Sequence, residues 1–545
     1  MSVAFVLIWP QNLDPLHSLA LSGIAASIPL MIVLILMGIL RKSALFASTC
    51  GLLATGAMAL LVWHMPMSLA LWSTAYGFAF AVWPILLIVF SALWLYNLSQ
   101  DSGNFDLLRR WMQHHASGDA CVQAILVAFC FGALLESCAG FGAPVAVTAY
   151  LLVGLGSDAR RAVLVALIAN TTAVAFGSMG IPIVALSAVT SLDLAKLSAM
   201  VGRQLPFLSF ILPGYLVWIV AGGRGLKRTW PAAVIAGGSF SLTLFLVSNL
   251  SGPYAADLIA ALASILILVA FLRFWSPSGE QTGHLSPKPS DGLQGPRGHH
   301  RLSPRGTFVA WLPWAMLSGV MVTWSYLKLF DRGQIKIPVP SLHNGILIAL
   351  YGKPYSAIYS FQPLFAGTAV LVAIVLTAIC LRVRLGDFRD SAIKSLRQLR
   401  LPGLTVIIII GVAYLYNYSG MAYTLGAAAA RLGYAFPLAS SFLGWVGCFL
   451  SGSVTASNVL FGNLQVAAAH QLHLNPVLLA ATNSSGSVFG KMISPQNIAV
   501  GVTTVGLIGE EGQILRSTFW HSIILTAMVG LLAFAQAYWM SWMVQ

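Results

Sequence analysis

The chain has 545 residues, of which 58% are hydrophobic and only 8% are charged. A typical soluble domain carries about 25% charged residues, so this composition excludes an ordinary soluble protein. The net charge of +14 does not indicate a nucleic-acid partner, because the basic residues lie in short segments between apolar runs rather than on one face of a helix.

Long apolar runs recur along the chain. A helix needs roughly 20 mostly apolar residues to cross a bilayer. Several runs reach or approach that length: Leu19–Leu40, Ala44–Trp63, Leu69–Leu98, Trp230–Leu250, Ala256–Trp275 and Leu364–Leu381. Since lipid cannot pair backbone polar groups, such runs form helices. We therefore predict an all-α polytopic protein, embedded in the lipid bilayer, with about 12 to 14 transmembrane helices or half-spans.

The basic connections predict the orientation. Lys and Arg concentrate in cytoplasmic loops, which places Arg109-Arg110 and Arg160-Arg161 inside. No Lys or Arg precedes the first apolar run, which favours an external N-terminus without a cleaved signal peptide. One basic segment conflicts with this orientation, because counting the spans puts it outside: it contains Lys328, Arg332, Lys336 and Lys353.

The stretch "FGALLESCAGFGAPVAVTAYLLVGLG" (131–156) is too rich in Gly and Pro for a straight helix. Irregular backbone at membrane depth persists only where protein or a water-lined cavity covers it. Glu136 lies inside this stretch, where a carboxylate is costly unless it is paired, solvated or protonated. We interpret Glu136 as the residue that carries a coupled proton or cation. The alternative is a neutral structural carboxyl bonded to loop backbone.

Two cations lie in other apolar segments. Arg203 belongs to "MVGRQLP", and Lys491 lies within "NSSGSVFGKMISP" (483–495). Basic side chains near helix ends often extend to the membrane interface, and this remains the alternative for both. We predict that one or both bind an anionic substrate, because guanidinium offers bidentate carboxylate geometry and the N-termini of half-helices attract anions.

The Lys491 stretch repeats an earlier one. "NTTAVAFGSMGIP" (170–182) has the same order of Asn, two hydroxyl residues, Phe-Gly-x-Met and Pro, with Ser178 in the position of Lys491. "LSGSVTASNVLFGN" (450–463) is a second interrupted segment in the later part of the chain. Broken or re-entrant helices in matching halves indicate the binding site of a transporter.

The composition between the apolar parts divides the chain into two membrane halves. Residues 276–306 are rich in Pro, Gly and Ser and cannot form a core. We predict a cytoplasmic linker there, between a first membrane half at 1–275 and a second at 307–545. The repeated copies lie around 121–190 and 437–505.

Neutral polar side chains in these segments are candidates for lining a substrate site, although such residues also bridge membrane helices. They are Asn170, Thr171, Thr172, Asn458, Asn483, Ser484 and Ser485. The six cysteines have no metal-ligand spacing, and no nucleotide-binding loop or paired catalytic motif is present. The sequence therefore predicts neither a metal nor a cofactor, and no enzymatic activity.

Motifs in a fixed order resemble a known family. "MPMSLALWSTAYGFAFAVWPI", "FGALLESCAGFGAPVAV", "ANTTAVAFGSMGIPIVALSAVT", "MVGRQLPFLSF", "LFGNLQ" and "NSSGSVFGKMISPQNIAV" are similar to the lactate permease family of bacterial secondary transporters. The resemblance covers about residues 20 to 505. It implies a proton symporter of the bacterial inner membrane that moves L- or D-lactate and often glycolate.

Two positions depart from the family pattern. The family usually has Gly-Ser-Asp-Thr-x-x-Asn at 452–458, whereas this chain has Val454 in the acidic position. Ser137-Cys138 replaces the Gly and Ala that commonly follow the first-half glutamate. The first departure bears on coupling or substrate choice, and the second on packing.

We therefore predict a secondary transporter that imports 2-hydroxymonocarboxylates by proton symport and alternating access. In this interpretation Glu136 carries the proton, Arg203 and Lys491 hold the carboxylate, and the Asn, Ser and Thr side chains bind the 2-hydroxyl. A transporter of di- or tricarboxylates, perhaps sodium-coupled, is the first alternative. A channel or membrane enzyme is a remote one, since an enzyme needs a nucleophile and base that the sequence does not offer.

Overall fold

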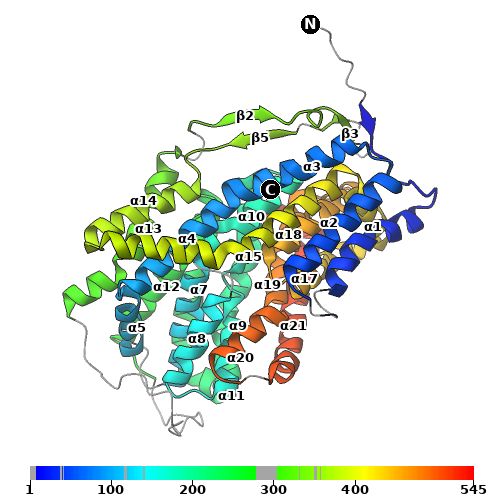
Figure 1. Ribbon diagram of the computed structural model, residues 1–545. Helices are drawn as coiled ribbons and strands as arrows, with labels where there is room; N and C mark the ends of the chain where they lie inside the picture. The colour runs from blue at the N-terminus through cyan, green and yellow to red at the C-terminus, as the bar shows by residue number, and fades with distance from the viewer. Residues whose placement is uncertain are drawn as a thin grey trace.

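The computed structural model describes residues 8–36, 40, 42–115, 119–138, 142–277, 303–329, 332–348, 353–355, 357–507 and 509–544. Within this part of the chain, eight helical segments are long and apolar enough to cross a bilayer. One further pair is bent by 59° at a short break, and four apolar helices of 10–17 residues accompany them. Figure 1 shows these helices gathered into one bundle. The predicted all-α polytopic membrane fold is confirmed.

The first half contains the buried span that carries Glu136. Its helices are α1 (Leu19–Leu34), α2 (Ala44–Leu61), α3 (Met67–Phe80), η2 (Ala81–Leu86), α4 (Leu87–Asp101), α5 (Asn104–His115), α6 (Ala120–Gln123), η3 (Ala124–Phe131), α7 (Gly132–Cys138), α8 (Ala143–Gly154), α9 (Ala159–Asn170), η4 (Val174–Phe176), α10 (Gly177–Thr190), α11 (Leu194–Leu250) and α12 (Ala256–Leu272). The continuous span made of α6, η3 and α7 is buried along its length. Protein, not lipid, therefore surrounds Glu136.

Several helices of the second half begin at residues whose side chains cap the helix N-terminus. Its helices are α13 (Pro304–Tyr326), α14 (Ala366–Leu381), α15 (Leu385–Tyr418), α16 (Met421–Ala429), η6 (Ala430–Ala435), α17 (Phe436–Ser451), α18 (Val454–Gln471), α19 (Pro476–Lys491), α20 (Pro495–Thr504), α21 (Glu511–Tyr538) and η7 (Ser541–Met543). Ser453, Asn475 and Ser494 cap α18, α19 and α20 through their side chains. Pro476 and Pro495 occupy first-turn positions that need no N–H donor. These residues fix where the broken helices restart.

α11 is a helical hairpin rather than one span. Gly222 has φ 63° and ψ −165°, a backbone conformation essentially restricted to glycine. The two legs lie side by side, since Ser198 Oγ donates to the carbonyl of Ser248 across 2.9 Å. The predicted run at 230–250 forms most of the second leg. The break carries the basic residues Arg224, Lys227 and Arg228.

Short strands cover one end of the bundle. They are β1 (Trp9–Pro10), β2 (Ile335–Pro338), β3 (Ile346–Ile348), β4 (Lys353–Pro354) and β5 (Ile358–Phe361). β3 pairs with β1 in parallel and with β4 antiparallel, while β2 and β5 form a second, antiparallel pair (Figure 1). The sequence analysis did not predict these strands. Through β1, the first described residues share this end of the molecule with the segment that carries Lys336 and Lys353.

Helices from before and after the predicted linker pack against each other in the middle of the bundle. α10 packs against α7 and α18, and α19 packs against α11, α17 and α18. Figure 1 shows α7, α10, α18 and α19 near the middle of the bundle. The predicted linker at 276–306 lies mostly outside the described residues, which stop at 277 and resume at 303. The division into two repeated halves stays a prediction.

Candidate functional site

Glu136 and Lys491 form a buried ion pair. Lys491 Nζ donates to Glu136 Oε1 across 2.7 Å, although the two residues lie 355 positions apart in the sequence. Their side chains are only 4% and 7% exposed. Glu136 lies in α7 of the first half and Lys491 ends α19 of the second. Removing two charges from water costs several kcal/mol per ion. In this conformation each side chain therefore needs the opposite charge of the other to offset that cost.

Asn170 holds the second carboxylate oxygen. Its Nδ2 donates to Glu136 Oε2 across 2.8 Å, so each oxygen of the carboxylate has a partner. Asn170 ends α9, where the chain bends toward α10. Within the described residues its Oδ1 is buried without a hydrogen-bond partner. An acceptor therefore remains free beside the ion pair.

The ion pair borders a cavity of about 70 Å³. Its walls include Ile85 and Val89 from the first half, the start of α10, and residues Gly452–Thr455, which lead from the end of α17 into the first turn of α18. A water molecule occupies about 30 Å³ in the liquid, so the cavity holds more than one. Val454, which departs from the family pattern, is one of the wall residues.

The corresponding positions of the repeated motif both line this cavity. They are Ser178 in the first copy and Lys491 in the second. Each copy breaks its helix there. Ser178, Met179 and Gly180 have φ values of 46°, 60° and 75°, while α19 ends at Lys491 and α20 begins at Pro495. The repeated motif thus brings one helix break from each half to one cavity.

Three predicted amide and hydroxyl residues form a network beside the cavity. Asn458 Nδ2 donates to the Pro182 carbonyl and to Ser484 Oγ, both across 3.0 Å. Asn483 Nδ2 donates to Asn458 Oδ1 across 3.1 Å. Gln465 extends the network to Asn483. These contacts tie α10, α18 and α19 together, and none of these side chains lines the 70 Å³ cavity.

The remaining predicted hydroxyl residues make other contacts. Thr171 and Thr172 directly follow α9 and donate to the carbonyls of Ile168 and Ala169 in its last turn. Ser485 Oγ donates to Gln204 Oε1 across 2.7 Å. None of the three hydroxyls bonds to Glu136 or Lys491 in the described structure. They stabilise helices and the contact between α11 and α19.

Arg203 lies away from the ion pair. Its Nε donates to Asn249 Oδ1 across 3.0 Å, and its Nη1 donates to the carbonyl of Met543 across 2.8 Å. Arg203 is not among the residues that line the cavity. The structure therefore does not bring Arg203 and Lys491 together into the predicted carboxylate clamp.

The sequence analysis missed two buried polar residues. Gln204, the neighbour of Arg203, donates to Thr482 and Gln536 and joins α11, α19 and α21. Asp257 is 1% exposed at the start of α12. The criterion that singled out Glu136, an acid inside an apolar run, also applies to Asp257 in the run from Ala256 to Trp275.

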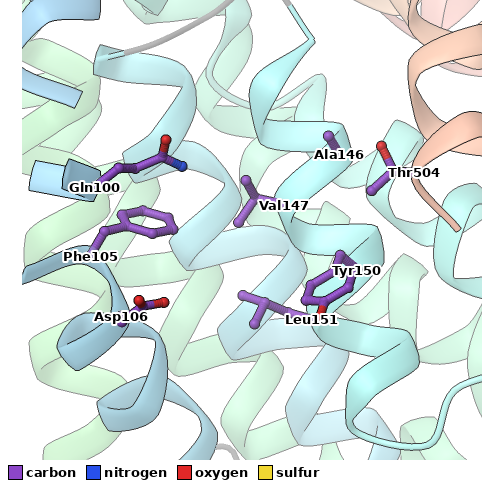
Figure 2. A pocket seen from close by; sticks show the side chains of 8 residues that line it. All are labelled: Gln100, Phe105, Asp106, Ala146, Val147, Tyr150, Leu151 and Thr504. Carbon is purple, nitrogen blue, oxygen red and sulfur yellow. The ribbon is translucent and has the colours of Figure 1, made fainter. Parts of the chain in front are cut away.

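A larger cavity lies next to α20. It measures about 330 Å³, and Figure 2 shows Phe105 and Asp106 of α5 across from Val147 and Leu151 of α8. None of the predicted site residues lines it. Thr504 at the end of α20 is part of its wall, so α20 extends from the Lys491 region to this cavity.

Solved structures give only a weak likeness. The YdaH transporter of Alcanivorax borkumensis is 13% identical with a TM-score of 0.43, over 86% of this chain and 87% of that one. MtrF of Neisseria gonorrhoeae also has 13% identity and a TM-score of 0.43, over 86% of this chain and 83% of that one.

The comparison with known sequences is strong. A family model described as L-lactate permease matches residues 22–540. The L-lactate permease of Escherichia coli O6:H1 is 40% identical over 98% of this chain and 100% of that protein. Glycolate permease GlcA of Escherichia coli K12 is 39% identical over 97% and 98%, and the L-lactate permease of Bacillus subtilis is 38% identical over 98% and 100%. These relatives are transporters, not enzymes, and the chain belongs to the L-lactate permease family.

Proposed function

We propose that this protein imports L-lactate, D-lactate and glycolate by proton symport. The observation that carries the proposal is the Glu136–Lys491 pair, which is buried beside a small cavity where the two halves meet. The names of the relatives support the choice of substrates, because they include both lactate and glycolate permeases.

The ion pair supplies a physical reason for coupling. An ammonium group has three donors, and Glu136 is the one hydrogen-bond acceptor of Lys491 Nζ in the described residues. A substrate carboxylate at Lys491 would bring a second anion beside Glu136 in a poorly solvated site, which is strongly unfavourable. A proton on Glu136 removes that repulsion and frees Lys491, so proton and substrate bind together.

The cavity walls favour a small monocarboxylate. Lys491 is the only cation among its described wall residues, so a dicarboxylate would leave one carboxylate without a cationic partner. Asn170 is not one of the wall residues, but its unpaired Oδ1 lies beside the ion pair, where it can accept a hydrogen bond from the 2-hydroxyl once the pair opens. Ser178 and Thr455 add hydroxyl groups to the cavity wall. Asn458, Asn483 and Ser484 support these walls through their network.

The orientation follows from the basic loops. We place α5, with Arg109-Arg110, on the cytoplasmic side of the bacterial inner membrane. The 330 Å³ cavity beside α5 then becomes a route toward the cytoplasm. The strand layer and the N-terminus lie on the periplasmic side in this arrangement.

Alternating access would operate at the contact between the halves. Transporters with repeated halves move one against the other around a fixed site. Here Glu136 comes from the first half and Lys491 from the second, so separation of the halves requires their ion pair to open. Neutralising Glu136 with a proton makes that opening less costly.

The test is uptake of radiolabelled L-lactate into proteoliposomes with an imposed inward proton gradient. We expect accumulation that a protonophore abolishes and that glycolate and D-lactate compete away. Accumulation driven by a sodium gradient, or strong competition by succinate, would contradict the proposal. Empty liposomes and a preparation checked for folding serve as controls.

Gly177 permits the close approach of Glu136. A Cβ at this position would lie 2.8 Å from Glu136 Oε1, so Gly177→Ala should displace the carboxylate from Lys491. We expect at least about a tenfold loss of uptake, since small misplacements in such sites are costly. Gly154→Ala is the matched control, because nothing lies within 4 Å of its added Cβ. Equal uptake by the two variants would contradict the assigned geometry.

A variant of Arg203 can test whether Lys491 alone binds the substrate carboxylate. Its guanidinium bonds to Asn249 and Met543 rather than facing the cavity. We expect Arg203→Gln to change the apparent lactate affinity by less than about threefold, which corresponds to less than about 0.7 kcal/mol. The measurement is the concentration dependence of uptake. A tenfold or greater loss would restore Arg203 to the substrate site.

A further inference from the structure

Asp257 is a second buried carboxyl near the ion pair. It lies in the first turn of α12, two positions after the N-cap residue Ala255. α12 packs against α7, which carries Glu136. Just before α12, Pro253 packs against the left-handed break of α10, since a Cβ on Gly180 would lie 2.8 Å from it. The start of α12, where Asp257 lies, is therefore packed between the helix that carries Glu136 and a helix break that lines the cavity.

The carboxyl of Asp257 has no hydrogen-bond partner among the described residues. Both of its oxygens are buried and unpaired within the part of the chain that the structure describes, and the residue is 1% exposed. An isolated buried carboxylate is so costly that such a group takes up a proton. Glu136 differs, because Lys491 and Asn170 both donate to it. In this conformation the two acids thus have unlike environments.

The titratable groups around Asp257 determine which of them can exchange a proton with it. Its electrostatic partners among the described residues are Glu136 of α7 and Lys491 of α19. Cys138, also on α7, is close enough to interact electrostatically with Asp257, and Cys130 of η3 bonds to Ser264 two turns further along α12. From α10 and α11, the other helices packed on α12, no described titratable group interacts with it. Glu136 is the only acid in this set.

We propose that Asp257 is a proton relay that delivers the coupled proton to Glu136. This inference rests on the proposed proton symport and adds the group through which the proton arrives. Asp257 holds a proton while Glu136 is ionised and paired with Lys491. When substrate binds, the Asp257 O–H bond breaks and the proton joins Glu136. The Asp257 anion takes up a replacement proton from water once the two halves move and expose it.

The charges balance at both ends of this sequence. Before transfer, neutral Asp257, the Glu136 anion and the Lys491 cation sum to zero. Afterwards neutral Glu136, re-protonated Asp257, the Lys491 cation and the substrate anion also sum to zero, with one proton gained per substrate. The transient Asp257 anion lies at the N-terminus of α12, where the helix dipole stabilises negative charge.

A proton suits this position better than a metal cation. Hard cations require several oxygen ligands. Neither Asp257 oxygen has a polar partner in the described structure, and no group of three His, Cys, Asp or Glu side chains that could hold a metal is found among the described residues. Chains of acidic groups inside membrane segments form proton relays in pumps and transporters, and Asp257 with Glu136 makes such a pair of acids.

The test compares Asp257→Asn with the wild type in proteoliposomes. Asn keeps the shape of Asp but carries no exchangeable acid proton. We expect lactate exchange across the membrane without a gradient to stay within threefold of wild type, and proton-driven accumulation to fall at least tenfold. Asp257→Glu should restore part of the accumulation. Asp101→Asn, which removes a partly exposed acid paired with Lys394, is the control and should leave both activities unchanged.

Infrared difference spectroscopy of the purified protein supplies a readout independent of transport. A protonated carboxyl gives a C=O band that a carboxylate lacks, and Asp257→Asn should remove one such band at neutral pH. An unchanged spectrum, wild-type accumulation in the variant, or loss of exchange together with accumulation would each overturn the relay. If the wild-type protein accumulated lactate equally well with and without a proton gradient, both the proposed symport and the relay would be overturned.

Discussion

Replacing Lys491 by glutamine is expected to lower L-lactate uptake about a hundredfold, because truncating one partner of a buried charged contact costs about 2–5 kcal/mol of binding free energy and each 1.4 kcal/mol is a factor of about ten. The side chain is the only cation among the described walls of the cavity. Glutamine keeps donors but cannot offset a substrate carboxylate. The loss should appear both in proton-driven uptake and in lactate exchange, since both need substrate bound at this position.

A solvated ion pair of equal length is the matched control. Lys394 Nζ lies 2.7 Å from Asp101 Oδ1, as in the buried pair, but the side chains are 41% and 33% exposed. Surface pairs contribute only about 0–1 kcal/mol, so Lys394→Gln should leave uptake unchanged. If Lys491→Gln transported as well as Lys394→Gln, Lys491 would be a structural partner of Glu136 and not a substrate ligand.

Stability and transport can be separated at this pair. Lys491→Gln leaves the Glu136 carboxylate buried without its cation, whereas the double variant with Glu136→Gln removes both charges. Neutral replacement of a buried pair is often tolerated. The double variant should therefore regain thermal stability without regaining proton-driven uptake, which shows that the lost activity is not a folding defect.

The sequence predicted the membrane fold and the two residues of the ion pair, but not that they bond to each other. Composition and interrupted apolar segments identified Glu136 and Lys491 separately, since each is costly at membrane depth. Their contact spans 355 positions and depends on how α7 and α19 pack. Contacts between helices that are far apart in the sequence produce no periodic pattern in the sequence of either helix.

The same limit explains Arg203. One residue along α11 decides which face of the helix a side chain occupies. Gln204 points toward α19 and bonds to Thr482, whereas Arg203 bonds to Asn249 and to the carbonyl of Met543. The charge in "MVGRQLP" belongs to Arg203, yet its neutral neighbour Gln204 makes the buried contacts to α19 and α21.

The repeated motif was more informative than its individual residues. Its Asn residues have different partners in the two copies: Asn170 bonds to Glu136, and Asn483 bonds to Asn458. The position of Ser178 and Lys491 is what the copies share, because both line the cavity at a helix break. Sequence spacing predicts where backbone is irregular, while the role of each side chain depends on the neighbouring half.

Glu136→Gln is expected to separate substrate exchange from proton coupling. Glutamine approximates a permanently protonated glutamate, so Lys491 stays available for the substrate carboxylate. Exchange of lactate across the membrane should remain within about threefold of wild type, less than about 0.7 kcal/mol. Proton-driven accumulation above equilibrium should disappear, because no proton binds or leaves at this position during the cycle.

The pH dependence has a definite sign. In the wild type, acidification favours protonated Glu136, opens the pair with Lys491 and raises lactate binding, so exchange should rise as pH falls. In Glu136→Gln the pair is absent at every pH, and this dependence on pH should be lost. Exchange measured from acid to alkaline pH in both proteins checks this. If Glu136→Gln still accumulated lactate against its gradient, the coupled proton would have to bind to another group. A loss of accumulation in Asp257→Asn would then identify Asp257 as that group.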